Sequence, residues 1–176
     1  MANPTMTLIG SPIVVGSGGA SSVTFSSIPQ TYTDLMLQTS LRTNYASVDD
    51  WDQTIFNSDT SGNYSFTYLY GNGSTTGTGK TASNATGIQL TRASGANATS
   101  NTFGSSTAYI ANYTSSNAKQ ISVDDISESN ISSGVTQQMI AGLYRGSAIS
   151  SITLSPVNGT SFTQYSTFYL YGIASS

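Results

Sequence analysis

The stretch "YSFTYLYG" (Tyr64–Gly71) alternates strictly between two kinds of side chain. Aromatic rings fall on one face, and the other face carries small hydroxyl residues and a leucine. A period of two is what an extended strand presents to its two sides, whereas a helix repeats about every 3.6 residues. The same period returns in "STFYLYGI" (residues 166–173) and in "DLMLQTSLRT" (residues 34–43). These stretches predict a β-protein.

Shorter candidate strands are separated by clusters rich in Gly, Asn and Ser, and no window keeps the apolar spacing of an amphipathic helix. The shorter candidates are residues 13–15, 23–25, 54–56, 88–91, 107–113, 120–123, 139–144 and 149–154. Residues 44–53 and 94–106 lack a strand signal and are expected to form loops. We therefore expect an all-β fold, a single jelly-roll-like antiparallel β-sandwich of about ten strands with little or no helix.

One domain is the expectation for 176 residues, because no linker or change of composition divides the chain. We assign residues 12–176 to the sandwich and residues 1–11 to an N-terminal arm that clasps a neighbouring molecule. The chain begins at Met and ends shortly after its last candidate strand, so we expect a complete small gene product.

The composition is polar but almost uncharged. Ser and Thr make up roughly a third of the chain, and charged residues only 7%, with a net charge of −3. Cys and His are both absent, which excludes disulfides, thiolate chemistry, histidine acid–base catalysis and histidine-ligated metals. The five basic residues are scattered, so no nucleic-acid patch is expected, and no apolar run approaches the length of a membrane span.

One segment, "GNGSTTGTGKT" (residues 71–81), is similar to a phosphate-binding loop. Gly79, Lys80 and Thr81 fit the end of that motif, but Ser74 stands where its first Gly is required. The motif must also open a helix, and the following residues indicate a turn and a strand. We interpret the segment as a flexible hairpin loop.

Carboxylates offer two further possibilities, glycosidase chemistry and Ca²⁺ binding. A glycosidase needs a marked pair of acids, and nothing marks a pair among the eight acids of this chain. The clusters "VDDWD" (residues 48–52) and "VDDISE" (residues 123–128) lack the spacing of a calcium loop, so solvated loop acids are the preferred interpretation. We expect no catalytic residue, no metal, no cofactor and no enzymatic activity.

Aromatic residues in the expected loops are candidate contacts for a partner. Trp51 is the best single candidate for stacking on a sugar ring, although a plug at one end of the core or a subunit contact is favoured for it. Tyr45, Trp51 and Tyr113 are the predicted interface anchors, because aromatic residues are enriched where partners bury surface.

Three long stretches resemble a known family: residues 28–43 ("IPQTYTDLMLQTSLRT"), residues 56–74 ("FNSDTSGNYSFTYLYGNGS") and residues 142–173, which end in "STFYLYGI". They are similar to the small β-sandwich virion proteins of tailed bacteriophages, especially phages of aquatic bacteria and cyanobacteria. The resemblance extends from about Pro12 to Ile173. Family members often carry His before the Leu-Tyr-Gly segment, where this chain has Thr67 and Tyr68.

The resemblance implies a structural protein of the virion with no established catalytic residues. Similar domains occur in capsid decoration proteins and in fibres; because long fibres usually need hundreds of residues with a coiled-coil or β-helical shaft, we expect a capsid decoration (cement) protein, made in the host cytoplasm and bound to the capsid exterior. As implied partners we expect the major capsid protein and two further copies in a homotrimer, with no nucleic acid and no membrane. The alternative is a tail or head fibre domain that recognises a glycan on the host surface.

Overall fold

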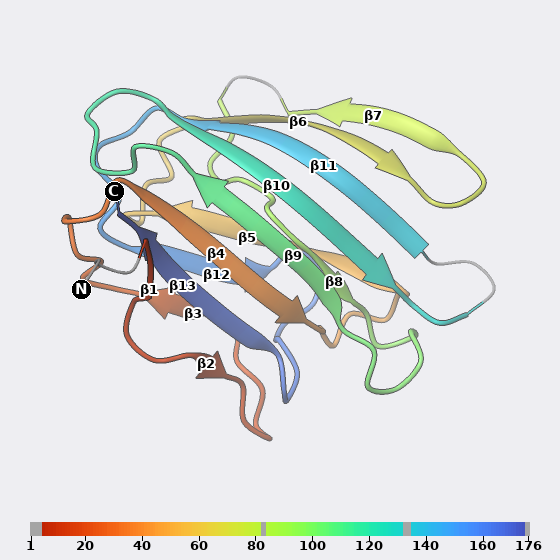
Figure 1. Ribbon diagram of the computed structural model, residues 1–176. Coiled ribbons are helices and arrows are strands. Elements are labelled where there is room, and N and C mark those ends of the chain that lie inside the picture. Colours follow the sequence, from red (N-terminus) through yellow and green to blue (C-terminus); the bar gives the residue numbers. More distant parts are fainter. Residues whose placement is uncertain (1–4, 82–83, 132–134, 175–176) are drawn as a thin grey trace.

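The protein consists of two antiparallel β-sheets packed face to face, as a computed structural model shows (Figure 1). The structure describes residues 5–81, 84–131 and 135–174, and within these ranges it contains strands and no helix. The expected all-β, jelly-roll-like sandwich is therefore confirmed. The described residues form thirteen strands rather than about ten, and several of these strands are only two or three residues long.

The larger sheet has nine strands in the order β1-β13-β4-β9-β10-β11-β6-β7, and β2 lies beside β13 at the same edge as β1. Its strands are β1 (Met6–Leu8), β2 (Ile13–Val14), β4 (Asp34–Leu41), β6 (Tyr64–Gly71), β7 (Thr76–Lys80), β9 (Gly104–Ile110), β10 (Lys119–Glu128), β11 (Val135–Tyr144) and β13 (Thr167–Ile173). The smaller sheet has the order β3-β12-β5-β8. Its strands are β3 (Val23–Phe25), β5 (Asp49–Phe56), β8 (Arg92–Ser94) and β12 (Ile152–Pro156).

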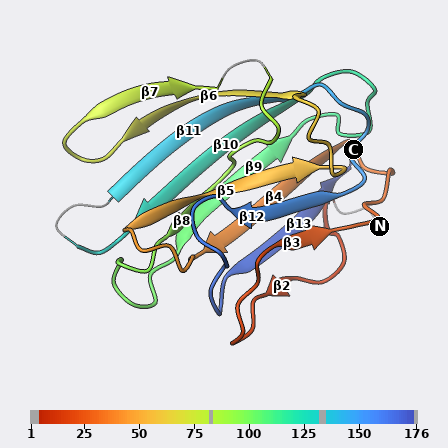
Figure 2. The ribbon, with the colours of Figure 1, turned by 180° about the vertical axis from the view of Figure 1, so that it is seen from behind.

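Between the sheets lies the apolar core. On β4, the expected alternation is confirmed, since Leu35, Leu37 and Leu41 are fully buried on the same face as the buried Thr39, while the intervening residues on the other face are only partly buried. Rings from both sheets meet in this core; Phe56 of β5 and Tyr144 of β11 contact at 5.1 Å between centroids. Figure 2 shows the smaller sheet in front, with the β6–β7 hairpin at the far edge of the larger sheet.

The packing of β7 explains why the segment that is similar to a phosphate-binding loop is rich in glycine. Gly77 and Gly79 lie opposite Tyr70 and Tyr68 of β6, and each tyrosine ring covers the glycine beside it. A Cβ at Gly79 would lie 2.3 Å from the Tyr68 ring, so a side chain there would displace the ring. The segment is half of a β-hairpin, and the prediction of a flexible loop over all of it was wrong, because β7 occupies its second half.

Two other expectations differ from the structure. Residues 44–53 were expected to form a loop, but β5 begins at Asp49. Part of the expected N-terminal arm forms β1, which pairs with β13 of its own chain through Met6 and Ile173. The first four residues, 1–4, lie outside the described residues.

Candidate functional site

The outer face of the larger sheet turns away from the core and is nearly uncharged. Along its strands, the side chains on this face are mainly hydroxyls, amides and aliphatic groups, with four charged exceptions. The charged side chains are Asp34, Lys80, Asp124 and Glu128. A wide sheet face with so few charges is suited to a partner whose recognition does not depend mainly on ion pairs.

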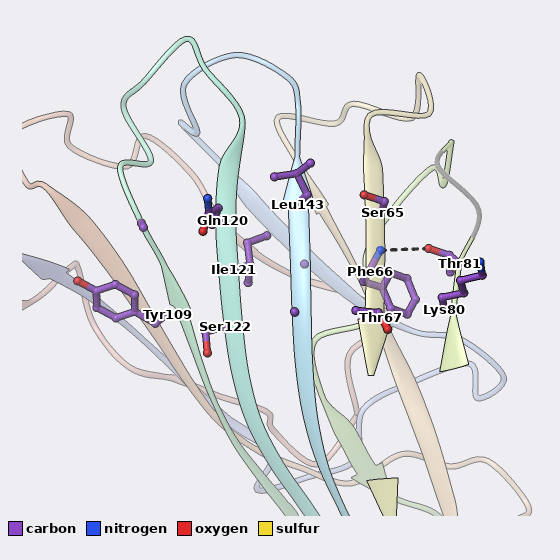
Figure 3. Close-up of a pocket in the computed structure, with 13 residues that line it drawn as sticks. Ser65, Phe66, Thr67, Lys80, Thr81, Tyr109, Gln120, Ile121, Ser122 and Leu143 are labelled. Carbon is purple, nitrogen blue, oxygen red and sulfur yellow. Dashed lines mark hydrogen bonds between the residues drawn. The ribbon is translucent and has the colours of Figure 1, made fainter. Parts of the chain in front are cut away.

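A shallow trough crosses this face over β9, β10, β11, β6 and β7 (Figure 3). Strand registers place Tyr109, Ser122, Ala141, Thr67 and Lys80 in one row across these five strands. The three central side chains are small and the two at the ends are large. That difference hollows the sheet into a trough of about 670 Å³.

Polar groups of the trough are available to a ligand. Gln120 and Ser122 are exposed on β10, and Lys80 is exposed at the end of β7. Among the described residues, none of these three side chains has a hydrogen-bond or ion-pair partner. The described lining of the trough contains no carboxylate, so it offers hydrogen bonds and one positive charge but no acid pair for hydrolysis.

At one end of the trough, Tyr109 is held in place by Asp34. The Tyr109 hydroxyl donates a hydrogen bond of 2.5 Å to Oδ2 of Asp34, whose Oδ1 accepts from the backbone N–H of Asn112 at 2.7 Å. This hydrogen bond to Asp34 raises the pKa of the Tyr109 hydroxyl, because it stabilises the protonated form. The ring is thereby fixed at the border of the trough, with 38% of the residue exposed.

Next to the trough lies an apolar corner, which we define as Leu69, Met139 and Ile126. Leu69 and Met139 are cross-strand partners on β6 and β11, and they are 58% and 63% exposed. Ile126 on β10 is 43% exposed. A second hollow of about 860 Å³ lies beside Leu69 and Met139 and continues to the tip of the β6–β7 hairpin.

The three predicted interface aromatics lie apart from these features. Trp51 is on β5 rather than in a loop and is half-buried, with its ring 5.6 Å from the Tyr68 ring and beneath the Arg92 guanidinium at 4.4 Å. Tyr113 is fully buried, and its hydroxyl donates to the carbonyl oxygen of Pro29. Tyr45 is half-buried between β4 and β5, and its carbonyl oxygen accepts from the backbone N–H of Ala96.

These three aromatics do not share one surface. Trp51 and Tyr45 lie at the end of the sandwich where β4 finishes, whereas Tyr113 follows the opposite end of β9. The residues that sequence reasoning missed are Tyr109, Leu69 and Met139. The alternation could have identified Tyr109 and Leu69, because each lies on the face of its strand opposite the face that carries the buried side chains.

The acidic clusters were expected to be solvated loop acids; they lie on β5 and β10, and the expected solvation was wrong for Asp50, Asp52 and Asp125, whereas Asp124 and Glu128 are exposed. Asp50 and Asp52 are 2% and 0% exposed on β5, and Asp125 is 1% exposed on β10. Asp50 accepts hydrogen bonds from the backbone N–H groups of Asn158 and Gly159 at 3.2 and 2.9 Å. The carboxylates are buried because they satisfy backbone donors of neighbouring segments.

Asp52 and Asp125 are bound to consecutive backbone amides before and at β8. Asp52 Oδ1 accepts from Leu90 and Thr91 at 3.0 and 2.6 Å, and Asp125 Oδ1 accepts from Arg92 at 2.9 Å. Burial raises the pKa of Asp52 to about 6 and, together with repulsion from Asp52, the pKa of Asp125 to about 8. The two acids are enclosed within the sandwich and have no access to a substrate.

A polar layer surrounds Asp125 where β8 faces β9 and β10. Its members include buried polar atoms that have no hydrogen-bond partner among the described residues. These atoms are Thr91 Oγ1, Arg92 Nε, Ser94 Oγ, Ser127 Oγ, Ser129 Oγ and Gln138 Oε1. Arg92 also forms an ion pair with Asp49. Buried polar groups of this kind are commonly satisfied by ordered water.

No group of three or more acidic side chains that could hold a metal ion occurs among residues 5–81, 84–131 and 135–174. In the same ranges, no helix is long and apolar enough to cross a membrane.

Comparisons with known proteins do not assign a family. No family model matches the sequence, and no curated protein matches it. A solved structure from Bacteroides ovatus, titled as a mixed linkage glucan GH16 protein in complex with G4G4G3G product, aligns over 93% of each chain with 10% identity and a TM-score of 0.16. Such a score does not establish a shared fold.

Proposed function

We propose that this chain is a structural protein of a phage virion, a decoration protein that binds the outer surface of the capsid and stabilises it. The proposal rests on the resemblance of residues 12–173 to phage virion proteins and on one observation, the apolar corner of the larger sheet. Leu69 and Met139 lie side by side and are mostly exposed, although large apolar side chains of this kind are usually buried. Exposed clusters of large apolar side chains mark contact surfaces for other proteins.

The proposed mechanism is preferential binding to the assembled shell. A ligand that binds only the assembled state stabilises that state by mass action. Fully burying a Leu or Met side chain contributes about 1.5–3 kcal/mol, so many copies together would strengthen the shell appreciably. The major capsid protein is the proposed partner, and a homotrimer on a local symmetry axis is the proposed arrangement.

A binding role is supported over a catalytic one by the positions of the acids. Asp52 and Asp125 lie inside the sandwich, and the described lining of the trough has no carboxylate. The alternative, a fibre domain that recognises host glycan, is supported by the hydroxyl and amide groups of that trough. The two functions differ in how many copies a virion carries.

Copy number in purified virions therefore tests the proposal. Quantitative gel analysis of virions would measure the ratio of this chain to the major capsid protein. A constant ratio that corresponds to hundreds of copies supports decoration. A handful of copies, located at the tail or at a single vertex by immunogold labelling, would replace decoration with the fibre function.

A further inference from the structure

We infer that the trough on the outer face of the larger sheet is a binding site for an acidic oligosaccharide. The inference does not depend on the capsid, since it concerns the chemistry of the trough in the free protein. It goes beyond the proposed decoration function, which requires only the apolar corner.

The shape of the trough suits an elongated ligand that lies across the strands. Its central row runs from Tyr109 on β9 to Lys80 on β7, which are four strand spacings apart. Four spacings correspond to roughly 19 Å between the two backbones. Ala141 in the middle leaves the floor open, while Leu143 borders the trough on one side.

Side-chain chemistry along the trough matches the hydroxyl-rich surface of a sugar. The Ser122 hydroxyl and the Gln120 amide can both donate and accept hydrogen bonds. The Thr67 hydroxyl already donates to the carbonyl oxygen of Gly79 and can still accept, and the Ser65 hydroxyl already accepts from Arg145 and can still donate. Tyr109 adds an aromatic border that the hydrogen bond to Asp34 holds in place before a ligand arrives. Pre-organised groups lose less conformational entropy when a ligand binds.

Lys80 selects the acidic class of sugar. It is the charged member of the described lining, it is exposed, and no partner among the described residues neutralises it. A carboxylate or sulfate on the ligand would form a charge-assisted hydrogen bond with Nζ of Lys80. The described lining contains no carboxylate; Asp34 and Asp124 lie on the same outer face but outside the lining, and the Asp34 carboxylate accepts hydrogen bonds from Tyr109 and Asn112.

The test is a titration of the purified full chain with matched acidic and neutral sugars. Suitable probes are tetragalacturonate against maltotetraose, and sialyllactose against lactose, followed by isothermal calorimetry at low and high salt. We expect at least one acidic probe to bind more tightly than its neutral counterpart, by about tenfold, with affinity that falls as salt rises. The inference is overturned if no acidic probe binds at millimolar concentration, or if neutral probes bind equally well.

Variants then locate the site. Ala141→Leu fills the floor of the trough with a side chain that a strand tolerates, and we expect it to weaken binding of the acidic probe at least about tenfold. Gln137→Leu is the matched control, because Gln137 is exposed on the same face of the same strand outside the lining of the trough. Lys80→Ala should remove the preference for the acidic probe and leave neutral binding unchanged. Unchanged acidic binding in Ala141→Leu would overturn the assignment to this trough.

Discussion

The same tetrapeptide, Tyr-Leu-Tyr-Gly, occurs on β6 and on β13 and faces opposite ways in the two strands. On β13, Leu170 points into the core and is fully buried, while Tyr169 and Tyr171 lie on the outer face. On β6, the tyrosines point inward over the glycines of β7, and Leu69 is 58% exposed on the outer face. Identical residues thus lie in the core on one strand and on the exposed outer face on the other. The difference teaches that the inner face of the larger sheet serves stability, whereas the outer face is free for the binding role that we propose.

The largest expected effect comes from the inner face of β13. Phe168→Ala should lower the free energy of unfolding by about 3–5 kcal/mol, because it leaves a cavity beside Phe162 in the core. Tyr169→Ala, one position along the strand on the outer face, should cost about 1 kcal/mol or less. Urea denaturation of both variants measures the contrast, and equal losses would contradict the division of the two faces.

A smaller effect on the free energy of unfolding is expected where β7 pairs with β6. Gly79→Ala places a Cβ against the Tyr68 ring and should cost about 1–2 kcal/mol. Thr78→Ala, the neighbouring position on the outer face, is the matched control and should change stability by about 0.5 kcal/mol or less. Trp51 is the single tryptophan of the chain and contacts Tyr68, so its fluorescence should also change in Gly79→Ala but not in Thr78→Ala. Unchanged stability and fluorescence in Gly79→Ala would contradict the packing of the ring on the glycine.

The sequence predicted the sheets better than it predicted the use of their faces. Alternation identified β4, β6 and β13 because each has residues of contrasting polarity at successive positions. It could not show that β6 turns its leucine outward, since this depends on the glycines of β7, which are brought opposite only by the fold. It also placed Asp50 and Asp52 in a solvated loop, because the backbone donors that bind them come from distant segments.

The polar layer of the inner face predicts an unusual pH dependence. In the folded state Asp52 and Asp125 have pKa values raised to about 6 and about 8, above the unfolded value of 3.8. The folded protein therefore binds more protons than the unfolded chain between these values, so stability should fall as pH rises from about 4 to about 8. One unit of pKa shift corresponds to about 1.4 kcal/mol, so we expect a loss of several kcal/mol over that range, measured by urea denaturation at a series of pH values.

Substitutions at two neighbouring residues distinguish the titration of the buried acids from a general effect of the protein's net charge on stability. Asp125→Asn should flatten the pH dependence, because the titrating group is removed from the buried layer. Asp124→Asn, the exposed neighbour on β10, should leave the dependence unchanged. A steep dependence that persists in Asp125→Asn would assign it to other groups.

The smallest effect on stability is expected on the outer face, at the apolar corner. Leu69→Thr combined with Met139→Thr places β-branched residues, which strands favour, at both positions and removes exposed apolar surface. The free energy of unfolding should change by about 0.5 kcal/mol or less. A loss comparable to that of Phe168→Ala would show that the corner contributes to the core and not to a contact surface.

The most direct test of the outer face as the contact surface is the occupancy of capsids by this double variant. Particles stripped of the protein would be incubated with the wild-type chain or with the Leu69→Thr/Met139→Thr chain, and bound copies would be counted by quantitative gel. We predict near-complete occupancy by the wild type and a loss of at least about tenfold in affinity for the double variant, which remains folded. Full occupancy by the double variant at the wild-type concentration would contradict the assignment of capsid binding to the apolar corner.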